Sequence, residues 1–138
     1  MPDDGKVYAL DISEEWTTIA HRYWQRAGVS DRIHLKLGSA ALTMAAMLEE
    51  GQSGFDAIFI DADKTGYAAY IQYGCELLRP GGFLMLDNVL WGGAVNDDSV
   101  DDEDTIALRR VNEAMLDDQR FDLSLVPIGD GLTLARKR

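Results

Sequence analysis

Two short apolar runs that end in oxygen-bearing side chains dominate the pattern of hydrophobic and polar positions. Residues 55–60 are mostly apolar and lead into Asp61, while residues 82–87 end in Asp87, which Asn88 follows. Nearly continuous apolar runs of this length are typical of strands buried on both faces of a parallel sheet. In such sheets, ligands bind just beyond the carboxyl ends of the strands. The pattern therefore predicts a binding site at one edge of an α/β sheet.

The rest of the chain alternates between strand and helix patterns. Further strands are expected at 6–11, 33–37, 121–126 and 132–136, and helices between Ser13 and Gly28, between Ser39 and Gly51, from about 65 to 78, and from 104 to 118. The Asp-Gly pair at 130–131 indicates that the last two strands form an antiparallel hairpin. This order predicts an α/β fold with a mostly parallel sheet and one reversed strand at an edge.

Length and composition narrow the classes of function. A chain of 138 residues is expected to form a single domain, 1–138, with a sizeable core. A net charge of −11 argues against a nucleic-acid surface and against binding to anionic membranes. The single cysteine, Cys75, allows no internal disulfide. No apolar run approaches the roughly 20 residues of a membrane span, and the acidic start is unlike a signal peptide, so a cytoplasmic location is expected.

The strand-end side chains suggest a metal site. If the two apolar runs are neighbouring strands about 4.8 Å apart, Asp61, Asp87 and Asn88 could supply three oxygens to one Mg²⁺ or Ca²⁺. The alternative is that these residues cap the helices that follow. Lys64, one turn after Asp61, could act as a general base if its pKa is lowered, although a surface ion pair is the simpler interpretation.

Two further positions have both a functional and an ordinary interpretation. Asp11 ends the first predicted strand, where nucleotide-binding folds hold a ribose diol through a carboxylate. It could equally be a solvated acid or a cap near Ser13. Trp91 and the glycines after it could form a lid over a substrate, or an ordinary connection.

Taken together, these segments resemble the cation-dependent S-adenosylmethionine O-methyltransferases, the group of caffeoyl-CoA and catechol O-methyltransferases. The resemblance runs from about Gly5 to the last residue. It rests on the segments 9–12, 55–64, 78–82, 87–91 and 127–133. The strand-end sequence 61–64 followed by 87–88 is its most specific part.

The resemblance implies roles for individual residues. Asp61, Asp87 and Asn88 would hold the divalent cation, and Lys64 would take the proton of the acceptor hydroxyl. The cation would act as a Lewis acid and template for two vicinal phenolic oxygens. The residues implied to contact the cofactor or the acceptor are Asp11 at the ribose, Ile12 and Ala40 at the adenine, and Asp61, Asp63 and Trp91 nearby.

The chain departs from this family at its beginning. A helical segment, the first strand and a glycine-rich cofactor turn are expected before Gly5, so the chain is interpreted as the C-terminal two-thirds of a Rossmann-like methyltransferase domain with its first strand missing. The strands ending at Asp11 and Asp61 should then have unpaired edges. We expect poor binding of S-adenosylmethionine by this chain alone, and a homodimer that could restore the sheet.

The expected function is therefore a metal-dependent O-methyltransferase that acts on a catechol-like or other small hydroxylated aromatic acceptor, inactive if this fragment cannot bind its cofactor. One alternative is a catalytically dead, oligomerising remnant. Another is a metal-binding module of the response-regulator type, with Asp61 as phosphoacceptor, although the pair Asp87-Asn88 does not fit that pattern.

Overall fold

The computed structural model describes residue 2 and residues 4–138. The chain forms two compact units, of which the first ends at Ala46 and the second covers Met47–Arg138. Each unit is described by itself, and the expected single domain stays a prediction. Along the described part of the chain, no helix is long and apolar enough to cross a membrane.

The first unit pairs two parallel strands joined through a helix. Its elements are β1 (Val7–Asp11), α1 (Glu14–Ala27), the short 3-10 helix η1 (Ser30–Arg32) and β2 (Ile33–Leu37), followed by α2 (Ala40–Glu49), which crosses the division between the units. As predicted, α1 begins after Ser13, whose side chain accepts a hydrogen bond from the Trp16 amide, and ends at Gly28 in the left-handed conformation.

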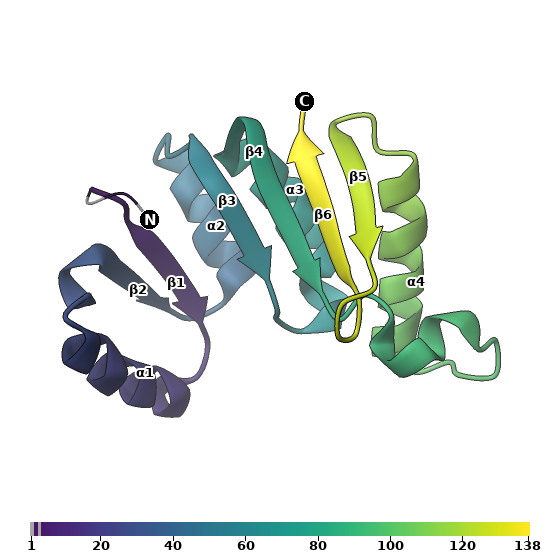
Figure 1. Cartoon of the computed structure of the whole chain (residues 1–138), viewed down its shortest axis with the longest axis horizontal. Helices are drawn as coiled ribbons and strands as arrows, with labels where there is room; N and C mark the ends of the chain where they lie inside the picture. The colour runs from purple at the N-terminus through teal and green to yellow at the C-terminus, as the bar shows by residue number, and fades with distance from the viewer. Residues whose placement is uncertain (1, 3) are drawn as a thin grey trace. The chain divides into compact units, whose positions relative to one another are not determined.

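The second unit contains a four-stranded sheet, seen in Figure 1. Its elements are β3 (Phe55–Ile60), η2 (Lys64–Gly66), α3 (Tyr67–Leu77), β4 (Leu78–Asp87), η3 (Trp91–Asn96), α4 (Glu103–Leu116), β5 (Phe121–Val126) and β6 (Leu132–Lys137). The strand order is β3-β4-β6-β5, with β3 and β4 parallel and β6 antiparallel to both of its neighbours. The predicted hairpin and the predicted parallel pair are therefore confirmed.

The reversed strand is not at an edge, so that part of the prediction was wrong. β6 lies between β4 and β5, and β5 forms the edge. Burial is consistent with these positions, because Ala135 and Thr133 of β6 are almost completely buried, whereas Leu125 of β5 remains 46% exposed. A strand with small, buried side chains suits the interior of the sheet, and the hairpin lets the strand before it take the edge.

The sequence also placed the start of β4 too late. The strand begins at Leu78, and its pairing with β3 is irregular, since Phe55 pairs with Leu78 and Ala57 with Phe83. A Cβ atom at Gly82 would lie 3.0 Å from the Arg79 carbonyl oxygen, so the bulge favours glycine.

The core of the second unit lies between the sheet and its two long helices. Figure 1 shows α3 behind the sheet and α4 beside β5. The buried side chains include Ile60, Leu84 and Leu86 from the strands, Tyr67 and Ile71 from α3, and Leu108 and Val111 from α4.

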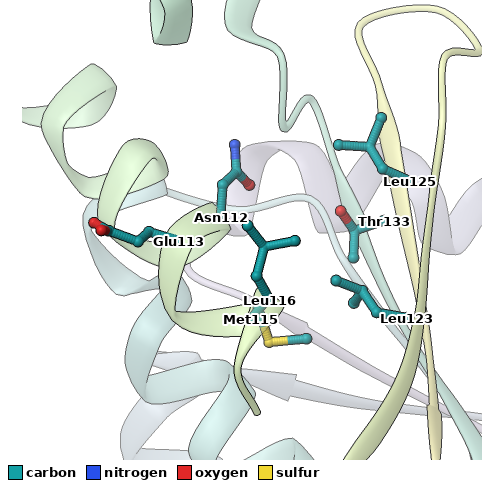
Figure 2. A pocket seen from close by; sticks show the side chains of 7 residues that line it. All are labelled: Asn112, Glu113, Met115, Leu116, Leu123, Leu125 and Thr133. Carbon is teal, nitrogen blue, oxygen red and sulfur yellow. The ribbon is translucent and has the colours of Figure 1, made fainter.

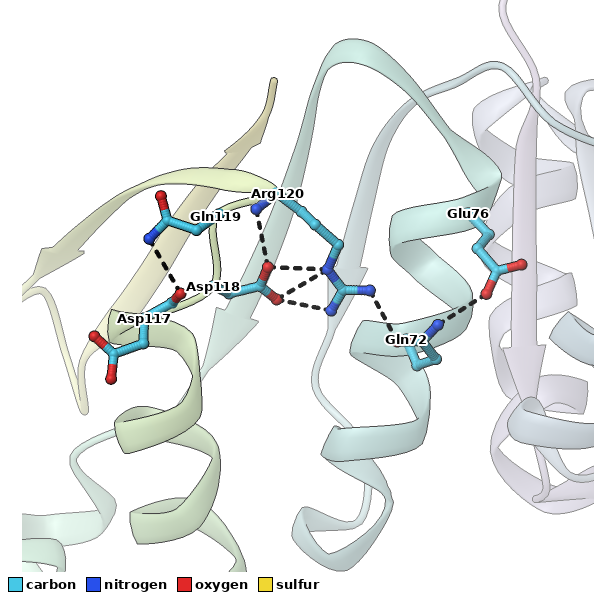
Figure 3. A network of polar contacts seen from close by, with 6 residues as sticks. All are labelled: Gln72, Glu76, Asp117, Asp118, Gln119 and Arg120. Atoms are coloured by element: carbon cyan, nitrogen blue, oxygen red, sulfur yellow. Dashed lines mark hydrogen bonds and ion pairs between the residues drawn. The ribbon is translucent and has the colours of Figure 1, made fainter.

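A surface network connects α3 to the turn before β5, as Figure 3 shows. The Arg120 guanidinium donates to Asp118 at 2.7 Å and to Gln72 Oε1 at 2.8 Å, and Gln72 donates in turn to Glu76.

Within the described residues, β1 is paired with β2 and β3 is paired with β4.

Candidate active site

The carboxyl ends of β3 and β4 bring the predicted metal ligands to one edge of the sheet. Ile60 pairs with Leu86 in parallel register, so Asp61 and Asp87 leave the two strands at the same level. The Lys64 ammonium lies 3.1 Å from Asn88 Oδ1 and 3.6 Å from Asp61 Oδ1. The structure therefore gathers residues that are 24 positions apart in the sequence.

A tight turn carries Lys64 to this position. η2 starts at Lys64 and reverses the chain before α3 begins. A Cβ atom at Gly66 would lie 2.6 Å from both Asp63 Oδ2 and the Tyr70 ring, so the turn needs glycine for close packing. The Tyr70 hydroxyl donates to Asp63 Oδ1 at 2.6 Å, and this bond holds the turn against α3.

Lys64 is a buried cation in a mixed polar and aromatic setting. The residue is only 5% exposed. Its Nζ atom donates to the Tyr67 hydroxyl at 2.6 Å and lies 4.6 Å from the centre of the Tyr67 ring and 5.4 Å from that of the Trp91 ring. Oxygen acceptors and aromatic faces both stabilise a positive charge that has lost its water.

Tyr67, which the sequence analysis did not single out, lies beneath this group. Burial, followed by the charges of Asp61 and Asp87, raises the pKa of Tyr67 well above its usual value. The neutral phenol donates to the Asp87 carbonyl oxygen at 2.9 Å, and the Ile60 carbonyl oxygen lies 3.3 Å away. The sequence feature that could have identified Tyr67 is its position three residues after Lys64, about one helical turn away.

The turn between β5 and β6 supports the segment that follows β4. The amides of Val89 and Leu90 donate to the carbonyl oxygens of Gly131 and Asp130, and the Gly92 amide donates to Asp130 Oδ1 at 2.6 Å. These bonds hold a segment in which two L-residues have positive φ angles.

Asn88 and Trp91 both have positive φ angles, 58° and 51°. Conformations of this kind persist where surrounding contacts enforce them, and they concentrate at binding sites.

The oxygen set at the strand ends fits a hard cation. The described residues contain no cluster of three or more acidic, histidine or cysteine side chains that could hold a metal ion, so the set depends on the Asn88 amide oxygen. Two carboxylates and an amide oxygen are the donors that Mg²⁺ and Ca²⁺ prefer. The Lys64 ammonium, already in contact with Asp61 and Asn88, shows that a positive charge is accommodated there.

The other predicted cofactor residues belong to the first unit. Asp11 ends β1, and its Oδ1 atom accepts a hydrogen bond from the Ser13 amide at 2.7 Å. Ile12, the next residue, is 79% exposed. Ala40 begins α2, three positions beyond Leu37, the residue that pairs with Asp11. All three therefore lie at the carboxyl edge of the β1–β2 pair.

An apolar hollow in the second unit lies away from the strand ends. Its volume is about 310 Å³. Figure 2 shows the side chains that line it, which come from α4 and the β5–β6 strands. Its lining residues are Asn112, Glu113, Met115, Leu116, Leu123, Leu125 and Thr133. None of these is a predicted site residue, so the cavity does not change the assignment.

Comparison with known proteins identifies the family to which this chain is similar. The O-methyltransferase family matches residues 1–138. A probable caffeoyl-CoA O-methyltransferase from Dictyostelium discoideum is 42% identical over 139 residues, which cover 99% of this chain and 60% of that protein. A caffeoyl-CoA O-methyltransferase from Eucalyptus globulus is 36% identical over 148 residues, covering 99% and 58% of the two chains.

Solved structures agree on the fold. The O-methyltransferase from Bacillus cereus, solved in complex with SAH, matches with a TM-score of 0.89 and 31% identity over 97% of this chain and 63% of that one. The O-methyltransferase TomG from Streptomyces achromogenes, solved in complex with SAM, matches with a TM-score of 0.91 and 27% identity, covering 99% and 64%. The predicted Rossmann-like fold is confirmed. The chain spans about 60% of the length of the curated relatives it matches.

Proposed function

Because this chain belongs to the O-methyltransferase family, we propose that it provides the catalytic strand ends of an enzyme that methylates a small aromatic acceptor. The methyl donor is S-adenosylmethionine, and the acceptor is a catechol-like hydroxyl. The main support is the position of Lys64, a buried amine between Asp61 and Asn88 at the ends of two parallel strands.

The proposed chemistry divides among the chain's own residues. Asp61, Asp87 and Asn88 would hold a divalent cation, which when bound supplies Lewis-acid activation of the acceptor oxygens. Lys64 in its amine form accepts the hydroxyl proton at Nζ. The acceptor oxygen then forms a bond to the methyl carbon, while the carbon–sulfur bond breaks and its electron pair stays on sulfur.

Other residues bind and orient the reactants in this proposal. The Asp11 carboxylate accepts hydrogen bonds from the ribose hydroxyls, with Ile12 and Ala40 beside the adenine. Asp63 and Trp91 flank the cofactor and the acceptor, and the support from the β5–β6 turn keeps the Trp91 segment in place. Such positioning converts an encounter between two reactants into an effectively unimolecular step, which lowers the barrier of a displacement.

Two measurements test the proposal. Mn²⁺ titration by calorimetry should show one site in the wild-type chain and at least tenfold weaker binding in Asp87→Asn, with Asp56→Asn as a matched control at an exposed acid that pairs with Arg79. Methyl transfer to a catechol from labelled S-adenosylmethionine should depend on added Mg²⁺. A folded chain that binds both S-adenosylmethionine and Mn²⁺ but transfers no methyl group would overturn the proposal and support the dead, oligomerising alternative.

The comparisons favour neither alternative function. Phosphorylation of Asp61 by acetyl phosphate would support the response-regulator type. The homodimer and the cytoplasmic location stay predictions, and analytical ultracentrifugation would test the first.

A further inference from the structure

The Tyr67 hydroxyl joins three parts of the strand-end cluster. It lies 2.6 Å from Lys64 Nζ, 2.9 Å from the Asp87 carbonyl oxygen and 3.3 Å from the Ile60 carbonyl oxygen. The Tyr67 side chain has no exposed surface. A single phenol thus connects the last residue of β3, the last residue of β4 and the buried amine between them.

The direction of each hydrogen bond follows from what the groups can do. A backbone carbonyl oxygen only accepts, so the one phenolic proton goes to Asp87 or Ile60. The hydroxyl therefore faces Lys64 with a lone pair and can only accept from it. An ammonium has three N–H donors and no acceptor, and an amine has two donors and one lone pair.

We propose that Tyr67 is a positioning residue that fixes the orientation of the Lys64 amine. In both protonation states of Lys64, one N–H is directed to the Tyr67 hydroxyl. The lone pair of the neutral amine is then excluded from that side. A second N–H is directed to Asn88 Oδ1, which can only accept, so the lone pair is left for the side of Nζ away from both oxygens.

The kinetic consequence rests on the proposed function, but the orientation itself does not. A general base must present its lone pair within hydrogen-bond reach of the proton that it removes. If the acceptor hydroxyl approaches Nζ from the side that Tyr67 does not occupy, the lone pair of a lysine held by Tyr67 points toward that hydroxyl. Without the tether, the flexible four-carbon side chain samples several rotamers.

Nitrogen-15 NMR of the lysine side chains tests the orientation without any need for activity. The sequence has four lysines. Lys6 and Lys36 are exposed, while Lys137 donates to the carbonyl oxygens of Cys75 and Leu78 at 2.7 Å and serves as an internal reference. At low temperature, Lys64 and Lys137 should give ammonium signals that exchange slowly with water, and Lys64→Arg should identify the Lys64 signal.

The decisive variant is Tyr67→Phe, which removes only the hydroxyl. We expect it to abolish the slow exchange of the Lys64 signal and leave that of Lys137. Tyr73→Phe, a half-buried tyrosine six positions further along α3, is the matched control and should leave both signals. An unchanged Lys64 signal in Tyr67→Phe would overturn the proposal. Loss of both protected signals would do so too, because it would indicate general loosening.

Kinetics separate this inference from the proposed function. In methyl transfer, Tyr67→Phe should lower kcat by about 10- to 100-fold and change KM for the acceptor less than twofold, because positioning of the base matters most in the transition state. An unchanged kcat together with a lost Lys64 signal would overturn the catalytic consequence. A wild-type chain with no methyl transfer would contradict the proposed function, while the NMR result would still decide the role of Tyr67.

Discussion

Acidic residues end strands in both units, but the two settings use them differently. In the first unit, the Asp11 carboxylate accepts a hydrogen bond from the amide of Ser13, two residues away. In the second unit, Asp61 faces a lysine that also contacts Asn88, the residue just after β4. One sequence pattern, an acid after an apolar strand, therefore gives a local cap in one place and a convergent cluster in the other.

The two acids differ in the kind of partner that their carboxylates have. Asp11 is exposed and has an amide donor supplied by its own turn. The Asp61 side chain is 53% exposed, but the Lys64 side chain beside it is only 6% exposed. A buried charge that loses its partners destabilises a protein by roughly 3–5 kcal/mol, whereas a single exposed interaction contributes about 1 kcal/mol or less. The cluster is thus the place where single substitutions should have the largest effects.

Replacement of the buried lysine should break the cluster most strongly. We expect Lys64→Met to lower methyl transfer by about 10²- to 10⁴-fold, the usual contribution of a general base. The fold should survive, because an apolar side chain of similar shape replaces a buried charge. Initial rates with labelled cofactor, together with urea unfolding, measure both effects.

Lys137→Met is the matched control. It removes another partly buried lysine that is bonded to backbone carbonyl oxygens, and it should destabilise the chain without a specific loss of rate. A Lys64→Met rate within threefold of the wild type would show that Lys64 is not the base.

Disruption of the β5–β6 turn, which supports the segment after β4, should have the next largest effect. In Gly131→Ala, the new Cβ would lie 2.5 Å from Leu90 Cγ at a φ angle of +84°. Overpacking and a left-handed alanine together should lower the free energy of unfolding by about 2–4 kcal/mol. Gly129→Ala, at φ +57° with nothing within 4 Å of the new atom, should lose only about 1 kcal/mol.

Urea unfolding of the two glycine variants compares them directly. Equal losses would mean that the turn does not press against the segment after β4.

Local signals in the sequence predicted much of the fold. The limits of β2, β3 and β5 agree with the structure, because each is a short apolar or alternating segment between polar turn residues. The ends of α1 also agree, since Ser13 and Gly28 cap it. The same locality made the antiparallel hairpin predictable.

Relations between distant segments could not be predicted from the pattern alone. The place of β6 inside the sheet depends on how its small buried residues compete with those of β5 for the neighbouring edge. The early start of β4 depends on a bulge that reaches past Gly82. The common level at which β3 and β4 end was predicted from topology, but no motif in the sequence marks the phenol of Tyr67, whose partners are Lys64 and two backbone carbonyl oxygens.

Asp11, the strand-end acid of the first unit, should affect cofactor binding rather than stability. In Asp11→Asn, an oxygen remains to accept from the Ser13 amide, but the negative charge is lost. We therefore expect unchanged stability and about tenfold weaker binding of S-adenosylmethionine in calorimetric titration, since charge-assisted hydrogen bonds are about twice as strong as neutral ones.

Ser13→Ala should have the opposite effect, a loss of stability with no change in cofactor affinity. It removes the side-chain cap on the Trp16 amide, so the chain should lose about 1 kcal/mol of stability with cofactor affinity unchanged. If Asp11→Asn instead destabilised the chain and left affinity alone, Asp11 would be a local cap and nothing more.

The smallest effect is expected at the surface network of Figure 3, where an acid has its partner two residues away, as Asp11 does. Hydrogen bonds from Arg120 are the main cause of the lowered pKa of Asp118. Because the pKa is lower in the folded chain, the stabilisation is complete above the unfolded pKa, near 4, and is lost as the pH falls through the folded value. Asp118→Asn should therefore be about 1 kcal/mol less stable than the wild type at pH 7, and the difference should shrink toward zero near pH 2. Urea unfolding across this pH range measures the difference, with the exposed neighbour Asp117→Asn as control. A difference that stays constant with pH would show that packing, rather than the charge of Asp118, is responsible, and the parallel with the locally bonded acid of the first unit would fail.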